Sequence, residues 1–269
     1  MSPLWRDEIA IYLAPHRVTL ARMKRGVRPQ NVKIQDTAVI GERIGGWDAT
    51  IGVLGGCLVD PIWNRAACRI IVANHWMRFA IVPWSDALSD SDERLLLAQH
   101  CLSKIYGDVA SQWRVTLNEA PPGRSQVACA IPRALLDEIE RHTESCGLRV
   151  RSIQPQLIAA FNCWRAQLPD TSGWFVTLEE GSLAAAHLSH GAWDAVRTVR
   201  TDKNWGVELR RLRTESRLAG NEAERIHLDA PQEFRAAVEG ASDEVVLLGE
   251  STGAVDIAAP LLLVQRIYA

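Results

Sequence analysis

Few residues of this chain have the types and spacing that chemistry requires. His187 and His190, in "HLSH", would form a metal-binding pair if both rings met one ion. Residues three apart in a strand point to opposite faces, so we expect these histidines to face solvent or a turn instead. The acidic residues Asp90, Asp92 and Glu93 begin a predicted helix, where carboxylates favour the helix dipole. No Cys-x-x-Cys metal motif occurs.

The stretch "IYLAPHRVTLARM", residues 11–23, is the second place where chemistry is expected. It is predicted to form a β-hairpin with Pro15 and His16 in its connection. In several nucleotide-binding folds the tip of such a first hairpin faces phosphate. The question is therefore whether this tip retains the groups that hold a phosphate.

Two groups of basic residues leave two interpretations open. Arg210, Arg213 and Arg217 share one face of a predicted helix, and a second group follows the hairpin at Arg22, Lys24, Arg25 and Arg28. Glu208 and Glu215 lie near the first group, which favours a solvated helix face. The alternative is a docking patch for an acidic segment or for anionic lipid head groups.

Composition limits the classes of function. The chain has 269 residues, 47% of them hydrophobic, and a formal net charge of −2, which argues against a general nucleic-acid binder. Its six widely spaced cysteines are expected to be reduced thiols of a cytosolic protein. We expect neither a secretory signal nor a membrane-spanning helix, because charges interrupt every apolar run. The ten tryptophans favour large core residues, with a peptide-gripping surface as the alternative.

The order of predicted elements indicates an internal repeat. A hairpin, a third strand, a helix and further strands begin at residue 8, and the same order begins at residue 174. Between the two copies the sequence predicts a helix, two strands, a second helix and a strand over "LRVRSIQ". A duplicated unit of this kind implies two similar lobes with an inserted subdomain, and ligands of such proteins usually bind between lobes.

This organisation resembles the actin-like ATPase superfamily, and the insert resembles its FtsA and PilM branch. The segments "NHWMRFAIVPW", "WRV" and "GLRVRSIQPQLIAAFNCWR" are similar to PilM-like proteins of type IV pilus assembly and to the cytoplasmic region of GspL in type II secretion. The resemblance implies a mixed α/β fold of duplicated ribonuclease-H-like lobes. Lobe I is expected over residues 1–170 with the insert at about 85–153, lobe II over 171–250, and a C-terminal helix over 251–269 that packs back on lobe I.

Active members of the superfamily hold Mg²⁺ through an Asp in the first hairpin and wrap phosphate with the backbone at a following Gly. By resemblance, Tyr12 stands at the Asp position and Ala14 at the Gly position. Pro15, in the turn, has no N–H to donate to phosphate. In the second hairpin Thr177 and Glu179 take these places, and Glu179 with Glu180 would place two carboxylates near phosphate, where like charges repel.

The third nucleotide loop, in "VVLLGES", keeps Gly249 but has Glu250 where a second glycine is usual. With all three loops altered, we expect neither hydrolysis nor a bound cofactor, ATP and Mg²⁺ included, and no metal. The alternative is a nucleotide-binding ATPase switch of the same fold. An unrelated α/β enzyme is a third hypothesis, which a structure without two similar lobes would favour.

The resemblance implies a cytoplasmic scaffold at the inner membrane, attached there through a partner. That partner would be a bitopic membrane protein similar to PilN, whose short cytoplasmic peptide binds between the insert and the main body of lobe I. The candidate groove residues are Trp76, Arg78 and Phe79, on the strand before the insert, and Trp113 within it. The peptide could pair with a strand edge. Binding of nucleic acid is not expected, and the sequence leaves a homodimer open.

Overall fold

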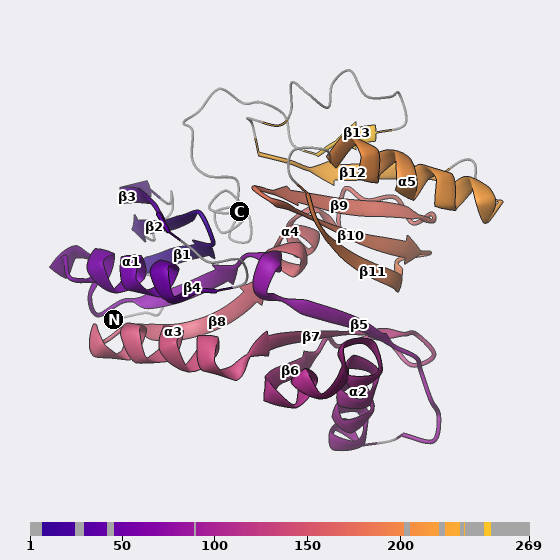
Figure 1. Ribbon diagram of the computed structural model, residues 1–269, viewed down its shortest axis with the longest axis horizontal. Coiled ribbons are helices and arrows are strands. Elements are labelled where there is room, and N and C mark those ends of the chain that lie inside the picture. Colours follow the sequence, from indigo (N-terminus) through magenta and orange to yellow (C-terminus); the bar gives the residue numbers. More distant parts are fainter. Residues whose placement is uncertain are drawn as a thin grey trace. The chain divides into compact units, whose positions relative to one another are not determined.

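The computed structural model describes residues 7–24, 30–41, 46–88, 90–201, 205–220, 224–231, 234 and 245–248 (Figure 1). Contacts divide the chain into two compact units. The first contains residues up to Trp76 and then Arg133–Cys163, and the second contains Met77–Pro132 and Trp164–Gly253. Between residues 7 and 231 the chain therefore passes from one unit to the other three times.

The first unit is built on a five-stranded sheet with the order β3-β2-β1-β4-β8. Its strands are β1 (Glu8–Ala14), β2 (Arg17–Lys24), β3 (Gln30–Ala38), β4 (Ala67–Val72) and β8 (Arg149–Pro155). β1, β2 and β3 form an antiparallel meander, whereas β4 runs parallel to β1 and β8 runs parallel to β4. Every residue of β1 is buried, which accounts for its nearly continuous apolar sequence.

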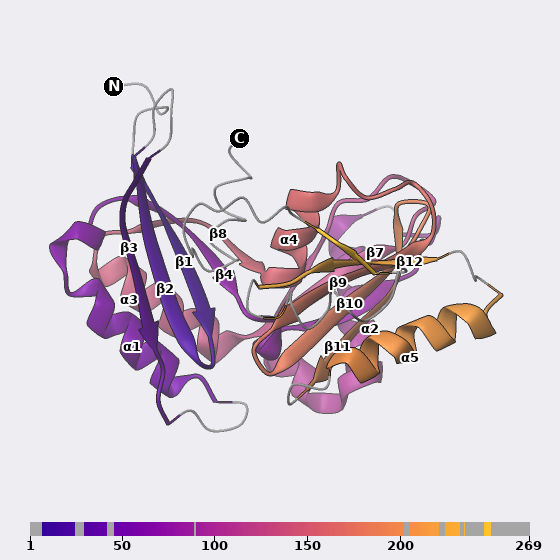
Figure 2. The same cartoon turned by 90° about the horizontal axis from the view of Figure 1, so that it is seen from above.

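Helices α1 (Asp48–Leu58) and α3 (Arg133–Ser145) cover one face of this sheet (Figure 2). They pack so closely that a side-chain carbon added at Gly55 would lie 2.7 Å from the His142 ring. A larger residue at position 55 would therefore require the His142 side chain to move. Two short 3₁₀ helices, η2 (Pro61–Trp63) and η3 (Asn74–Trp76), flank β4.

Side-chain contacts show which helix meets which face of the first sheet. Gln35 of β3 donates from Nε2 to Cys57 Sγ of α1 at 3.2 Å, so the odd-numbered residues of β3 face α1. Tyr12 of β1 lies on the opposite face, where its hydroxyl donates to Gln156 Oε1 at the start of α4 (Gln156–Trp164), at 2.8 Å. The first sheet is therefore covered by helices on both faces.

The second unit contains a five-stranded sheet with the order β11-β10-β9-β12-β13. Its strands are β9 (Gly173–Glu179), β10 (Ser182–Ser189), β11 (Ala192–Arg200), β12 (Arg225–Asp229) and β13 (Val245–Leu247). The first three form an antiparallel meander, and β12 runs parallel to β9 and to β13. The strand order and the directions thus repeat those of the first sheet.

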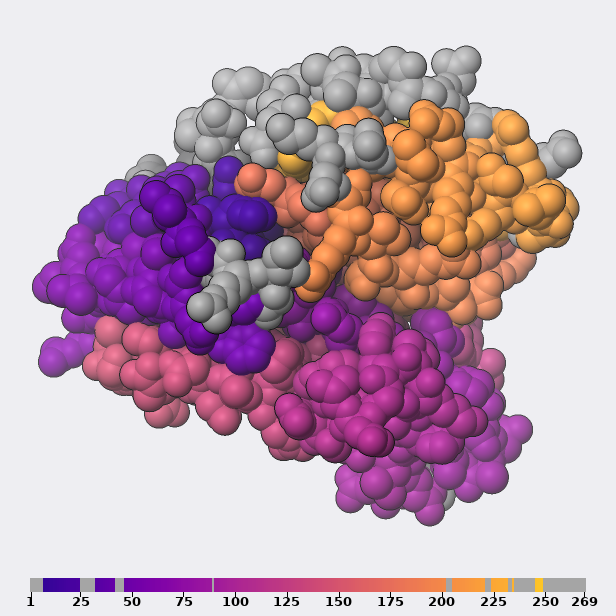
Figure 3. All heavy atoms as spheres, viewed as in Figure 1, coloured from indigo at the N-terminus to yellow at the C-terminus, as the bar shows by residue number. Residues whose placement is uncertain are grey.

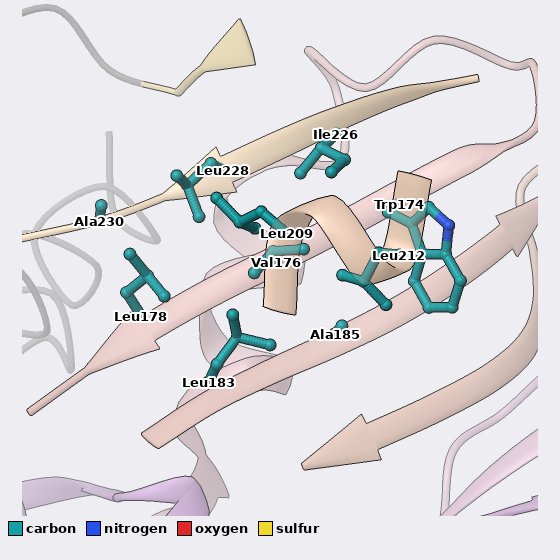
Figure 4. Close-up of a cluster of buried hydrophobic side chains, with 10 residues drawn as sticks. All are labelled: Trp174, Val176, Leu178, Leu183, Ala185, Leu209, Leu212, Ile226, Leu228 and Ala230. Carbon is teal, nitrogen blue, oxygen red and sulfur yellow. The ribbon is translucent and has the colours of Figure 1, made fainter. Parts of the chain in front are cut away.

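Helix α5 (Trp205–Leu218) covers one face of the second sheet and forms an exposed ridge on the surface (Figure 3). Beneath it, apolar side chains of β9, β10, β12 and α5 form a single cluster (Figure 4). Leu209 and Leu212 of α5 meet Val176 of β9 and Leu228 of β12 there, all with 4% or less of their surface exposed. Because these side chains come from distant segments, the cluster holds the meander and the parallel strands together.

A three-stranded sheet with the order β5-β7-β6 also belongs to the second unit. It contains β5 (Arg78–Val82), β6 (Trp113–Leu117) and β7 (Gln126–Pro132), and α2 (Ser91–Tyr106) packs on it through buried Ala98 and Leu102. α2 begins at Asp90, whose side chain accepts from the N–H of Asp92, and it ends at Gly107 with a φ of 76°. Both ends follow the signals predicted from the sequence.

The loop between β6 and β7 connects this small sheet to the five-stranded sheet of the same unit. Arg124 donates to the carbonyl of His190 at 3.1 Å, and Ser125 donates to the carbonyl of Trp193. The two carbonyls lie in the β10–β11 turn and at the start of β11. The second unit therefore contains the predicted second lobe and the predicted insert only up to Pro132, because α3 and β8, also expected in the insert, belong to the first unit.

The structure confirms the repeat and the mixed α/β fold. It also corrects the pairing of two strands. The segment "LRVRSIQ" was expected to close the insert, but β8 pairs with β4 in the first sheet, and it is β5 that joins the small sheet. The boundaries at residues 170 and 250 stay predictions, and the expected C-terminal helix over 251–269 lies outside the described residues.

Candidate functional site

The tip of the first hairpin is the first expected site. β1 and β2 are paired up to Ala14 and Arg17, so Pro15 and His16 alone make the turn. Pro15 is buried and His16 is exposed. The carbonyl of Ala14 accepts a hydrogen bond of 3.2 Å from Thr50 Oγ1 in the first turn of α1. The backbone at this tip is thus bonded to the protein's own helix.

Tyr12 is the residue expected, from the resemblance, to stand where active actin-like ATPases carry a magnesium-binding carboxylate. Its side chain is 5% exposed, and its hydroxyl donates to Gln156 Oε1. A phenol does not supply the anionic oxygen that Mg²⁺ prefers. On the same face, Thr19 donates to Asp36 Oδ1 at 2.6 Å. The described residues of this hairpin therefore do not fit a magnesium nucleotide.

The second hairpin, between β9 and β10, has different side chains at the corresponding positions. Thr177 is fully buried and Glu179 is 7% exposed, and Glu179 Oε2 accepts a 2.9 Å hydrogen bond from Ser182 Oγ across the turn. Glu180 is exposed, and Gly181 supplies the positive φ of 78° that the turn needs. One member of the expected carboxylate pair is therefore buried and hydrogen-bonded, whereas the other faces solvent. Gly249, in the third loop, lies outside the described residues.

The predicted groove residues lie on three elements that belong to two units. Trp76 lies in η3 of the first unit, and its indole N–H donates to the carbonyl of Gly46 at 2.8 Å. Arg78 and Phe79 lie in β5 and Trp113 in β6, all in the second unit. The placement of Trp76 on the same strand as Arg78 is therefore wrong, because the chain passes between units after residue 76.

The three aromatic candidates are buried. Trp76 is 3% exposed, Phe79 4% and Trp113 8%, and Trp113 packs edge-on against Tyr106 with ring centroids 5.3 Å apart. Side chains buried to this extent offer a peptide little surface. Arg78 is partly exposed; burial lowers the pKa of its guanidinium, Tyr106 opposes this shift, and the charge of Arg200 adds to it. The peptide-binding role of these four residues stays a prediction.

A polar network that the sequence did not reveal surrounds His187, and all of its members except Asp194 are buried or nearly so. Its Nδ1 lies 3.0 Å from Asp194 Oδ2, and its Nε2 lies 3.0 Å from Glu224 Oε1. Glu224 also accepts from Ser216 Oγ of α5, which in turn accepts from the indole N–H of Trp174 at 3.0 Å. The expectation that His187 faces solvent is therefore wrong, because these partners enclose it.

The network joins β10, β11, α5 and the residue before β12. Its role is structural, since all its members bond to one another within one sheet and its helix. His190, by contrast, lies in a turn with a φ of 48°, as expected. Within the described ranges, no three His, Cys, Asp or Glu residues are grouped so that they could hold a metal ion.

Comparison with solved structures identifies the fold of the chain. No protein-family model matches the sequence, and no curated protein matches it significantly. Among solved structures, a PilM–PilN type IV pilus biogenesis complex is similar, with a TM-score of 0.66, 12% identity, and 97% of this chain and 99% of that chain covered. A Bacteroides thetaiotaomicron protein of unknown function with an actin-like ATPase fold is also similar. Its TM-score is 0.59 at 9% identity, with 92% of this chain and 94% of that chain covered. This chain has the actin-like ATPase fold.

A third similar structure is the cytoplasmic domain of EpsL, an inner-membrane component of the type II secretion system of Vibrio cholerae. Its TM-score is 0.58 at 12% identity, with 97% of this chain and 94% of that chain covered. The actin-like fold of this chain therefore extends over nearly its whole length. No helix of the described residues is both long and apolar enough to cross a bilayer.

Proposed function

We propose that this chain is a non-catalytic scaffold of a type IV pilus or type II secretion platform, held at the inner membrane by a PilN-like partner. The single observation that carries the proposal is the state of the first hairpin. By the resemblance, Tyr12 stands at the position of the magnesium-binding carboxylate, and its hydroxyl donates to Gln156 Oε1. The similarity to the PilM and EpsL structures supports the choice of platform, and it implies a cytoplasmic location.

Both described hairpins support a non-catalytic role in the same way. The side chains that replace the phosphate-binding positions are buried and bonded to the protein itself, Tyr12 to Gln156 and Glu179 to Ser182. A nucleotide would have to break these bonds and leave buried polar atoms without partners, at about 1–3 kcal/mol for each group. A body that needs no nucleotide can serve as a fixed adaptor.

The edge of the small sheet is where we place the partner's peptide. Among the described strands, β6 pairs with β7 alone, so its other edge is open to an added strand. Arg114 and Thr116 on β6 are exposed and alternate with buried Trp113 and Val115. An extended peptide could form main-chain hydrogen bonds to this edge, and the exposed side chains would then contribute to specificity.

The experiment is to recover the partner from membranes and then to map its binding. We expect the chain to recover a bitopic membrane protein whose synthetic cytoplasmic peptide binds the chain with micromolar affinity. The double variant R114E/T116E should weaken that peptide at least tenfold, whereas R133E, on α3 of the first unit, should not. Recovery of soluble proteins only, or a peptide insensitive to all these changes, would contradict the proposal.

A further inference from the structure

One end of the first sheet carries exposed basic side chains that have no ion-pair partner among the described residues. We call this surface the basic end, and it consists of Lys24, Arg65, Arg149 and Arg151. The N-terminal ends of β4 and β8 and the C-terminal ends of α1 and α3 meet there (Figure 1). The four cations therefore come from three separate parts of the chain.

Strand register places Lys24 and Arg149 in one row across the end of the sheet, with their side chains on opposite faces. Glu8 pairs with Met23 on one side and with Ala67 on the other, and Ala67 pairs with Arg149. Lys24 follows Met23 directly, so Lys24 and Arg149 lie about three strand spacings apart, or roughly 14 Å. Such a row is too long for a single carboxylate or phosphate to bridge. It matches an array of separate anions.

Arg65 and Arg151 have unusual backbone positions. Arg65 has a φ of 56°, in the left-handed region that favours glycine, and its N–H donates to the carbonyl of Cys146. A long side chain there costs about 1 kcal/mol relative to glycine, so packing alone does not explain an arginine. Arg151 lies at a β-bulge, between the ladder partners Val150 and Ser152, and has no partner across the sheet.

The acidic groups at this end are largely neutralised. Three described carboxylates have ion-pair partners of their own within 3.0 Å: Asp7 with Arg22, Glu8 with Arg69, and Asp60 with Lys33. Glu144, near the end of α3, is exposed and is the acidic side chain closest in sequence to Arg149. The field outside the basic end is therefore positive, although the whole chain has a net charge of −2.

An apolar side chain projects beside these cations. Val59, immediately after α1, is 78% exposed and follows Leu58, whose carbonyl accepts from Cys146 Sγ; the carbonyl of Cys146 in turn accepts from the N–H of Arg65. An exposed valine next to arginines matches an interface where charges meet head groups and an apolar group enters the upper acyl region. A soluble acidic peptide would provide the charge but no apolar layer.

We propose that the basic end docks on anionic phospholipid head groups at a membrane surface. The inference goes beyond the scaffold function, because it gives the chain a direct contact with the bilayer that needs no protein partner. Each lysine or arginine near an anionic surface strengthens binding by about fivefold. The contact is weak by itself and adds to the attachment that the partner provides.

Vesicle flotation tests the proposal on the full chain. The probes are vesicles of phosphatidylcholine alone and vesicles with about a third phosphatidylglycerol, at low and high salt. We expect binding to the anionic vesicles only, and loss of that binding at high salt as the charges are screened. The variant R65N/R149Q/R151Q should partition about tenfold to a hundredfold less. The matched control K104Q/R133Q/R165Q removes the same charge from other exposed positions and should bind like the original chain.

Folding of the variants has its own measurement. Asparagine tolerates a positive φ better than arginine, so R65N alone should not lower the unfolding midpoint in urea while it lowers vesicle binding several-fold. Three results would overturn the proposal. They are equal losses in the triple variant and its control, binding to neutral vesicles alone, and tighter binding of soluble polyglutamate than of anionic vesicles. The last would indicate an acidic protein instead.

Discussion

The two five-stranded sheets have the same strand order, but their first hairpins end in different chemistry. In the first sheet a phenol, Tyr12, reaches across to α4, and a proline occupies the turn. In the second sheet the equivalent position is Thr177, fully buried, and the turn is closed by Glu179 and Ser182. The different side chains at equivalent positions show that the shared strand pairing does not depend on one side-chain chemistry at the hairpin.

The largest expected effect tests whether the two sheets are equivalent in stability. Leu13 in β1 and Leu178 in β9 are each the sixth residue of their strand and are 0% and 1% exposed. Replacement of either by alanine should lower the free energy of unfolding by about 2–5 kcal/mol, because each leaves a cavity. Urea unfolding followed by circular dichroism measures both. A loss below about 1 kcal/mol in only one of them would show that the two cores are not comparable.

A second, smaller effect compares the two hairpin bonds. Tyr12→Phe leaves Gln156 without its donor, and Ser182→Ala removes a donor from the buried Glu179. We expect losses of about 1–3 kcal/mol for each, with Ser182→Ala the larger because its bond involves a carboxylate. Thermal unfolding provides the measurement. Val32→Ala, at an exposed position of β3, serves as a control with little change.

Next in size is a dependence on pH that only the second sheet should show. Burial lowers the pKa of His227 below its ordinary value of 6.5, and the charge of Arg225 lowers it further. The folded chain then binds fewer protons than the unfolded chain near pH 6. Stability should therefore rise with pH through this range and fall on acidification. The equivalent position of β4 is Arg69, which is paired with Glu8.

The His227→Gln variant isolates this effect. Unfolding curves collected between about pH 5 and pH 7.5 should show a shallower dependence on pH than those of the original chain. Replacement of exposed His16 by Gln should leave the slope as it was. If His227→Gln and His16→Gln changed the slope equally, the burial of His227 would not be its cause.

The smallest effect concerns reactivity rather than stability. Burial raises the pKa of Cys68 in β4 to about 12, with a contribution from the charge of Glu8, and burial alone raises that of Cys129 in β7 to about 12. Both thiols should react with iodoacetamide far more slowly than Cys146, because the thiolate is the reactive form. Mass spectrometry of timed samples measures this. Equal rates at all sites would contradict the burial of Cys68 and Cys129.

Much of the fold could be predicted because its signals are local. The meander of β9, β10 and β11 was predicted from its two glycine turns, and Gly181 and Gly191 do have positive φ. The pairing of β8 was missed because a parallel strand pairs far along the chain, here Arg149 with Ala67. Nothing in the local sequence states which sheet such a strand joins.

The site was less predictable than the fold. Sequence shows that Tyr12 is not a carboxylate, but not that Gln156 binds its hydroxyl, since the two are 144 residues apart. The sequence around Trp76 is compatible with a surface anchor and with a core residue. Only the fold shows that Trp76 is buried. His187 was misread for the same reason, because Glu224 meets it from a different element.

Titration calorimetry of the full chain with Mg-ATP tests the central claim most directly. The claim is that both described hairpins have replaced phosphate binding with bonds inside the protein. It predicts no saturable heat into the millimolar range and no change in the unfolding temperature. A saturable isotherm with a micromolar dissociation constant, lost on removal of Mg²⁺, would contradict it.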